Sequence, residues 1–266
     1  MRDLFAAAIA LLIAIGPVRA QNAPSPDVLK ELAPTGKLRA AINFGNGVLA
    51  QKGPNNEPRG ITPDLATALA KRLGVPVEFV TREAAGKVAE LLATDAVDVG
   101  FIAIEPVRAA QITFTAPYLI IEGTYMVRQD SPLKEVGDAD KPGIKISVGL
   151  NSAYDLYLTR TLKNATLVRA SVGGGAAGIE LFVKDKLDAT AGVRQPLEIY
   201  AKGHPETRVM AGHFQEIRQA MGTPKVRGAA GAGYLKAFVE DMKASGFVAD
   251  ALKRSNQVAV VAPPAK

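Results

Sequence analysis

The stretch from Phe101 to Arg128, FIAIEPVRAAQITFTAPYLIIEGTYMVR, most constrains the fold of this chain. It begins within the apolar run Val97 to Ile104, which is typical of a strand buried on both faces of a parallel sheet. Glu105-Pro106 then ends the strand, because proline is well suited to the first position of a helix. Arg108 is therefore predicted to lie where the carboxyl end of a strand meets the amino end of a helix. Open α/β sheets bind their ligands at such places.

The same alternation of strands and helices runs along most of the chain. In the helix predicted after Thr62, an apolar stripe of Leu65, Leu69 and Leu73 is ended by Gly74. Further strands are predicted at Leu38–Ile42, Val75–Val80, Ile144–Gly149, Leu167–Ala170, Leu187–Val193 and Arg208–Ala211. Further helices are predicted at Ala84–Thr94, from Ser152, after Gly173–Gly175, and at Gln195–Lys202, Gly233–Ala244 and Gly246–Arg254. This order favours parallel sheets with right-handed crossovers.

A polar segment, DSPLKEVGDADKPG, lies between Arg128 and Gly143 and marks a boundary between two lobes. The chain then starts a second α/β unit, and it is predicted to cross back between Gln215 and Met221. Two crossings would make a hinge around a cleft. We therefore predict an α/β fold of two lobes, each a mainly parallel sheet flanked by helices. Residues 36–127 and 220–256 form the first lobe, residues 128–219 the second, and residues 257–266 a disordered tail.

Residues 1–20 are predicted to be a signal peptide. Met1-Arg2-Asp3 is a short charged start, Leu4 to Ile15 is an apolar core, and Val18-Arg19-Ala20 offers small residues at a cleavage site. The apolar run is too short for an ordinary membrane span, and no cysteine is present to carry a lipid anchor. We expect cleavage after Ala20 and export to the periplasm as a soluble protein, with an uncleaved anchor as the alternative.

The composition excludes several kinds of site. The chain has no cysteine, so it can have no disulfide, thiol nucleophile or thiolate metal site. His204 and His213 each stand beside a glycine, which is typical of surface loops rather than of a metal-binding pair. The formal charge of +6 comes from basic residues that are interspersed with acidic ones, so nucleic-acid binding is not expected. We expect no metal and no cofactor.

The segment IEPVRAAQITFTAPY resembles the family 3 solute-binding proteins, bacterial receptors that deliver amino acids and similar solutes to ABC importers. That family shows a strand, then T-x-E-R or a variant, then F-[ST]-x-P-Y. The segment RGITPDLATALAKRLGVPVEFV strengthens the likeness, which covers Gly36 to roughly Ser255. The resemblance implies the type II periplasmic-binding fold with two hinge crossings.

The resemblance also implies a set of ligand contacts. In the family, the arginine at the place of Arg108 holds the ligand carboxylate; a solvated helix arginine is the ordinary alternative. The loop after the first strand reaches the ligand, which makes Phe44 and Asn46 candidates, although a turn that needs glycine explains this loop equally well. The loop and helix start of the second lobe hold the far side of the ligand. The remaining candidates are Phe101, Ile102, Ala103, Asn151, Ser152, Ala153 and Tyr154.

The chain departs from the family pattern at Val193. Amino-acid receptors of this kind usually carry an aspartate there, which neutralises the ligand's ammonium group. Valine cannot do so, and the neighbouring Arg194 would repel an ammonium group. We therefore predict a small organic carboxylate, aromatic or dicarboxylic, with Val193 in the site and Arg194 as a second anion contact if its side chain points into the cleft. In the alternative, Glu122 or Asp155 replaces the aspartate and an amino acid binds.

Three functions fit the sequence, and we favour the first. The first is a monomeric periplasmic receptor, not an enzyme, which closes on a carboxylate or amino acid and docks on an inner-membrane ABC permease. The second is an enzyme on the same scaffold, similar to cyclohexadienyl dehydratase, which would need an acid or base in the cleft. Glu105 and Glu122 are the carboxylates nearest to Arg108 in sequence. The third is an extracellular sensing module.

Overall fold

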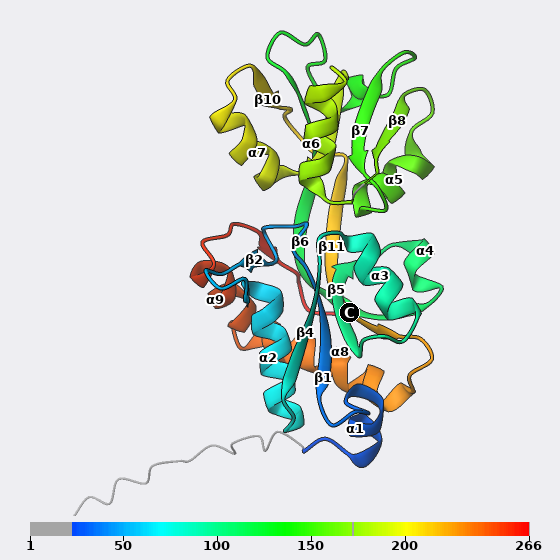
Figure 1. The fold of residues 1–266 in the computed structure, drawn as a ribbon, viewed down its shortest axis with the longest axis vertical. Coiled ribbons are helices and arrows are strands. Elements are labelled where there is room, and N and C mark those ends of the chain that lie inside the picture. Colours follow the sequence, from blue (N-terminus) through cyan, green and yellow to red (C-terminus); the bar gives the residue numbers. More distant parts are fainter. Residues whose placement is uncertain (1–22, 172, 266) are drawn as a thin grey trace, which may run out of the picture.

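The computed structural model describes residues 23–171 and 173–265. The predicted signal peptide, residues 1–20, lies outside the described residues. Two groups of helices and strands lie one above the other in Figure 1, joined by the long strands β6 (Ile112–Arg128) and β11 (Gln215–Pro224). This confirms the predicted two-lobed α/β fold. Among the described residues, none of the helices combines the length and apolar character needed to cross a membrane.

The first lobe, drawn below in Figure 1, is built on parallel strands. Strand β1 (Leu38–Asn43) pairs in parallel with β4 (Val77–Arg82) and with β5 (Val99–Ala103). Strands β2 (Gln51–Lys52) and β3 (Pro58–Arg59) form a small separate hairpin. The helices of this lobe are α1 (Pro26–Leu32), α2 (Ile61–Leu73), α3 (Ala85–Ala93), α4 (Pro106–Ala109), α8 (Ala229–Ala244) and α9 (Phe247–Arg254).

The second lobe repeats this plan with its own parallel strands. Strand β7 (Lys145–Gly149) pairs in parallel with β8 (Thr166–Ala170) and with β9 (Ala189–Val193). Strand β10 (Thr207–Val209) runs antiparallel to the end of β6. The helical segments are the short 3-10 helix η1 (Val136–Ala139) and the helices α5 (Ala153–Thr161), α6 (Gly175–Lys184) and α7 (Arg194–Gly203).

One hydrogen-bonded path joins the two lobes, in the order β4-β1-β5-β11-β6-β9-β7-β8. In the first lobe β11 lies antiparallel to β5, and Gln219 pairs with Ala103 there. In the second lobe β6 lies antiparallel to β9, and Gly123 pairs with Val193. The register between β11 and β6 shifts on either side of Ala220, so the crossing ribbon is irregular beside Gln219.

Both ends of the described chain contain regular structure. Helix α1 begins at Pro26, because Ser25 caps it by accepting a hydrogen bond from the Val28 backbone N–H. In place of the disordered tail predicted for residues 257–266, strand β12 (Val260–Val261) pairs antiparallel with β6 at Leu119 and Ile120. The reason is that β6 has a free edge here, and a short apolar strand satisfies its backbone groups.

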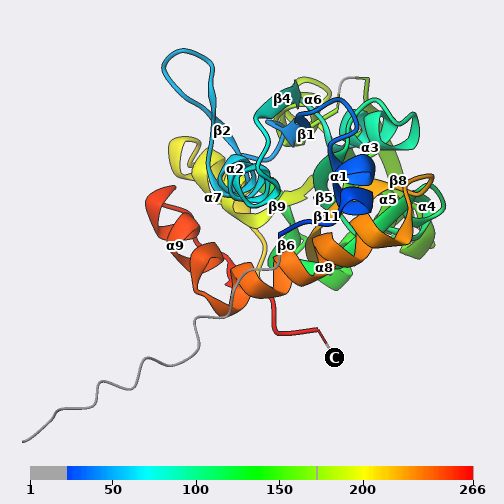
Figure 2. The ribbon, with the colours of Figure 1, turned by 90° about the horizontal axis from the view of Figure 1, so that it is seen from below.

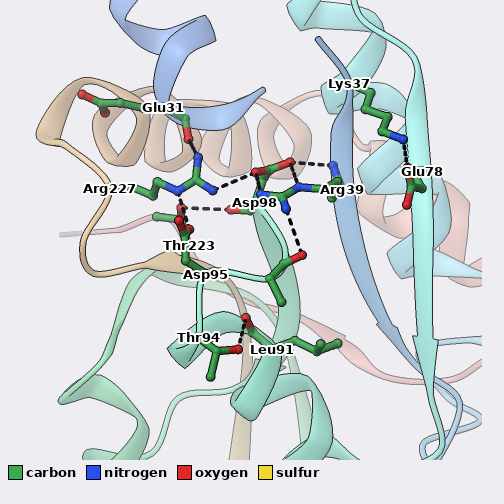
Figure 3. Close-up of polar contacts among 11 residues, drawn as sticks. Glu31, Lys37, Arg39, Glu78, Leu91, Thr94, Asp95, Asp98, Thr223 and Arg227 are labelled. Carbon is green, nitrogen blue, oxygen red and sulfur yellow. Dashed lines mark hydrogen bonds and ion pairs between the residues drawn. The ribbon is translucent and has the colours of Figure 1, made fainter. Parts of the chain in front are cut away.

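A buried carboxylate ties together segments of the first lobe that are far apart in sequence (Figure 3). Asp98, just before β5, is fully buried and pairs with Arg39 of β1 at 2.7 Å and with Arg227 at 3.0 Å. Arg227 follows β11 and also donates to the backbone carbonyl of Glu31 in α1. Figure 2 shows α1 beside α8, where the Glu31 carboxylate accepts a hydrogen bond from the Gly231 backbone N–H. These contacts fix the returning chain against the sheet that carries the site.

Replacing Asp98 by alanine should destabilise the protein by about 3 kcal/mol, since it leaves Arg39 and Arg227 without their shared partner. Urea unfolding followed by circular dichroism measures this free energy of unfolding. The control is Glu90→Ala, because the Glu90–Lys87 pair is exposed and its loss should cost no more than ~0.5 kcal/mol. Equal stability of the two variants would show that the buried network does not hold the lobe together.

Candidate ligand-binding site

A cavity of about 50 Å³ lies between the two lobes. It collects residues from the end of β5, from α4, from the starts of α5, α6 and α7, and from β11, so both lobes and a crossing strand contribute to it. Many of the residues predicted from the sequence line it together: Asn46, Ile102, Ala103, Arg108, Ser152, Ala153, Tyr154 and Val193.

Arg108 is the one charged side chain among the described residues that line the cavity. Pro106 starts α4 shortly after β5 ends, so Arg108 lies close to the end of that strand. Its side chain reaches Ala103, the last residue of β5, and is only 5% exposed. Its Nη1 donates to the carbonyl of Ala103 at 2.9 Å, and its Nη2 donates to the carbonyl of Asn151 at 2.8 Å. The guanidinium therefore bridges the lobes, and its other N–H groups remain for a ligand.

Burial also acts on the charge of this arginine. It lowers the pKa of Arg108 to about 10, and the nearby Glu105 acts in the opposite direction. The guanidinium thus stays a cation at neutral pH. Its two carbonyl partners carry no formal charge and no carboxylate is among the described lining residues, so the cavity presents a buried positive charge without an ion-pair partner in its lining.

The second-lobe wall of the cavity is neutral. Ser152 caps α5, and its hydroxyl accepts a hydrogen bond from the Asp155 backbone N–H at 3.0 Å. Burial raises the pKa of Tyr154 to about 12, so its phenol keeps its proton at neutral pH. Asp155 itself lies behind this wall, where it accepts hydrogen bonds from the Asn151 backbone at 2.8 Å and from Arg169 at 2.9 Å.

The wall formed by β9 and α7 is apolar at Val193, Pro196 and Leu197. The prediction that Arg194 is a second anion contact is not supported by this geometry. The Nε of Arg194 pairs with Glu122 at 2.5 Å and its Nη2 donates to the carbonyl of Gly212, so the side chain is held outside the cavity. Glu122 is in this pair, and Asp155 of α5 is held by Arg169 behind the wall of the cavity, so neither carboxylate replaces the family's aspartate here.

Three other residues that were predicted to contact the ligand do not line the cavity. Phe44 lines a neighbouring groove, and its ring lies 5.3 Å from the Nζ of Lys52. Phe101 is fully buried with its ring edge-on to Tyr118, because its side chain points into the core. Asn151 takes a positive φ of 58° in the turn between β7 and α5, and it meets Arg108 through its backbone carbonyl.

Several lining residues were not anticipated from the sequence: Asn43, Gly174, Gly175, Ile179, Ile217 and Gln219. Gln219 is the most informative of them, since it is only 4% exposed and its Oε1 has no hydrogen-bond partner among the described residues. The available signal was the alternation of Gln215, Ile217 and Gln219 along one face of the crossing strand.

The lobes meet closely around the cavity. The backbone N–H of Gly175 points at the carbonyl of Gly45 at 3.5 Å, and a Cβ on Gly174 would lie 2.9 Å from the carbonyl oxygen of Glu83. An ion pair adds to this contact: Glu105, only 1% exposed, pairs with Arg160 of α5 at 2.5 Å. The structure is thus a closed arrangement of the two lobes.

Known structures with the same fold include a mutant of ArgBP from T. maritima, at 18% identity and a TM-score of 0.73, covering 86% of this chain and 99% of that one. The cysteine-binding protein from Campylobacter jejuni has 18% identity and a TM-score of 0.72, with 88% and 99% covered. An ancestral amino acid-binding protein, described as a precursor of cyclohexadienyl dehydratase, has 24% identity and a TM-score of 0.70, with 85% and 98% covered.

Sequence comparison gives two results. No curated protein matches the chain at the significance required. The model of the bacterial extracellular solute-binding proteins, family 3, matches residues 49–254, which is most of the chain. The match includes the strand β5, the residue Arg108 and both crossing strands. The chain therefore belongs to family 3 of the bacterial extracellular solute-binding proteins.

Proposed function

We propose that this protein is a periplasmic receptor that closes on a small carboxylate and delivers it to an ABC importer in the inner membrane. The observation that carries the proposal is the buried cation of Arg108 in a cavity whose described lining holds no carboxylate. A ligand carboxylate would supply the missing negative charge and accept paired hydrogen bonds from the guanidinium. The protein is proposed to work as a monomer, with its signal peptide cleaved after Ala20.

The same lining argues against an α-amino acid as the preferred ligand. An ammonium group would lie near Arg108 and against Val193 and Ile217, with no carboxylate beside it among the described lining residues. An unpaired buried charge is costly, so the site should discriminate against it. The names of several structural neighbours refer to amino acids, and an amino acid therefore remains the competing ligand class.

The size of the cavity further narrows the ligand. Its volume of about 50 Å³ corresponds to roughly four water-sized positions, because one such position occupies about 10–15 Å³. This favours an acid with a short carbon chain over the aromatic acid considered from the sequence.

Closure is proposed to occur about β6 and β11. From Gly123 onward β6 is already paired with β9 of the second lobe, so its crossing lies before the boundary predicted at Arg128. The polar contacts that cross between the lobes beside the cavity include Arg108 with the carbonyl of Asn151, and Glu105 with Arg160. A ligand held by Arg108 would add its own contacts to both lobes and so favour the closed form.

An enzymatic function is the second candidate, because one structural neighbour is described as a precursor of cyclohexadienyl dehydratase. General acid–base chemistry needs a group that titrates near neutral pH within reach of the substrate. The described lining residues include no Asp, Glu, His or Lys, and burial raises the pKa of Tyr154 to about 12. Glu105 is outside the cavity, held by Arg160 and by the Nε2 of Gln215. Binding without turnover is therefore the better proposal.

Removing the guanidinium should abolish most of the binding. Arg108→Ala should weaken the binding of a confirmed acid by at least ~2 kcal/mol, about 30-fold, because the carboxylate loses its charged partner. Arg108→Lys should also bind more weakly, since lysine keeps the charge but lacks the fork. Titration calorimetry measures both changes. The control is Arg218→Ala, because Arg218 lies on the same crossing strand with an exposed side chain. Normal binding by Arg108→Ala would refute the assignment.

A matched ligand pair tests the charge requirement. Propionate and alanine differ at one carbon by the ammonium group, and the wild-type protein should bind propionate more tightly. The two titrations are done by calorimetry at the same ionic strength, with product analysis to detect turnover. A clear preference for alanine would refute the proposed ligand class, and turnover would favour the enzyme.

The ion pair between the lobes should support closure. Small-angle scattering should show a smaller radius of gyration when the wild-type protein is saturated with ligand. Arg160→Ala should need about fivefold more ligand for the same compaction, because the closed form loses roughly 1 kcal/mol of contact with Glu105. The control is Arg169→Ala, whose ion pair with Asp155 lies within the second lobe. Identical titrations for wild type and Arg160→Ala would show that this pair does not contribute to closure.

A further inference from the structure

Gln219 faces the cavity from the strand that carries the chain back to the first lobe. It pairs with Ala103 of β5, whose carbonyl also accepts the hydrogen bond from Arg108. The register shift between Gln219 and Ala220 lies at this point. Such irregularities re-aim a side chain relative to a regular ladder. The amide of Gln219 and the guanidinium of Arg108 are thereby placed against the same space.

The amide of Gln219 is not used by the described part of the protein. Its Oε1 is buried and has no hydrogen-bond partner there. The amide oxygens of the other two such residues in the lining do have partners, because the Oδ1 of Asn43 accepts from the Gly45 N–H at 2.9 Å and that of Asn46 accepts from the Val48 N–H at 3.2 Å. A buried acceptor left without a partner costs about 1–3 kcal/mol. A donor on the ligand would remove this cost.

We propose that Gln219 selects acids that carry a hydroxyl group next to the carboxylate, so that the ligand class is a short-chain 2-hydroxy acid. This inference rests on the proposed function, in which Arg108 holds the carboxylate. The hydroxyl of such an acid donates to Oε1 of Gln219 while the carboxylate stays on the guanidinium. A hydroxyl can also accept, so the pairing holds for either orientation of the amide group.

A hydroxyl fits this position better than an ammonium group does. An ammonium group would donate one hydrogen bond to Gln219, but its charge and its other N–H groups would face Arg108, Val193 and Ile217. A single neutral donor satisfies the amide without adding a second buried cation. Short 2-hydroxy acids also suit the small volume of the cavity, about 50 Å³.

The test compares three acids of equal chain length: lactate (both enantiomers), propionate and alanine, titrated into the full protein by calorimetry at one ionic strength. The wild-type protein should bind one enantiomer of lactate about 10-fold or more tightly than propionate, because propionate leaves the amide unpaired. In Gln219→Leu, which is close to isosteric, this ratio should fall to within about twofold, because neither acid then faces an unpaired amide.

The matched control is Gln129→Leu, since Gln129 is exposed and lies outside the cavity. It should keep the wild-type preference for lactate. The wild-type ratio of lactate to propionate is itself decisive if Gln219→Leu does not fold, and a ratio near one overturns the inference. A ratio that Gln219→Leu leaves unchanged also overturns it.

Failure of the inference can be separated from failure of the proposed function. Equal binding of lactate and propionate, both lost in Arg108→Ala, refutes the role of Gln219 and leaves the carboxylate receptor intact. Preference for alanine refutes both. If none of the three acids binds, the 2-hydroxy acid class is wrong, and a wider panel of carboxylates with Arg108→Lys then decides the proposed function.

Discussion

A buried cation shared between two lobes is the interaction on which the rest of this structure depends. Arg108 is 5% exposed and donates to one backbone carbonyl from each lobe. Its position requires the abrupt change from β5 to α4 at Pro106, and it requires Asn151 in a turn with positive φ so that a carbonyl points across the cleft. The cost of a buried charge is offset only when the lobes and a counter-charge come together. The burial of the Arg108 charge therefore links the arrangement of the lobes to the binding of an anion.

Local signals predicted the architecture, and several residues predicted to form the site line one cavity in the structure. The apolar run ending in Glu105-Pro106 located the end of β5, and the family resemblance then pointed to Arg108 and to the helix start at Ser152. These features depend on neighbouring residues, so the sequence displays them directly. The two-lobed fold followed from the order of such segments.

Other features depend on partners far away in the chain, and the sequence does not display those. Arg194 begins a helix and could point either way; its contact with Glu122, on another strand, holds it outside the cavity. The alternation along β11 shows which face Gln219 shares, but only the pairing of β11 with β5 places that face against the cavity. Strand β12 forms because β6 has a free edge, which the residues of the tail alone cannot reveal. In each of these cases the local sequence allows two structures, and a contact with a distant part of the chain decides which one forms.

The two crossing strands have a mechanical consequence. β6 and β11 are hydrogen-bonded to each other along most of their length, and so form an antiparallel ribbon rather than two separate tethers. Stretching the ribbon or sliding one strand past the other would break its hydrogen bonds. The proposed motion of the lobes should therefore keep the register of the two strands. Each closure would then bring Gly45 back opposite Gly175 in the same alignment. The hydrogen bonds between β6 and β11 would thus set how reproducibly the two walls of the cleft meet.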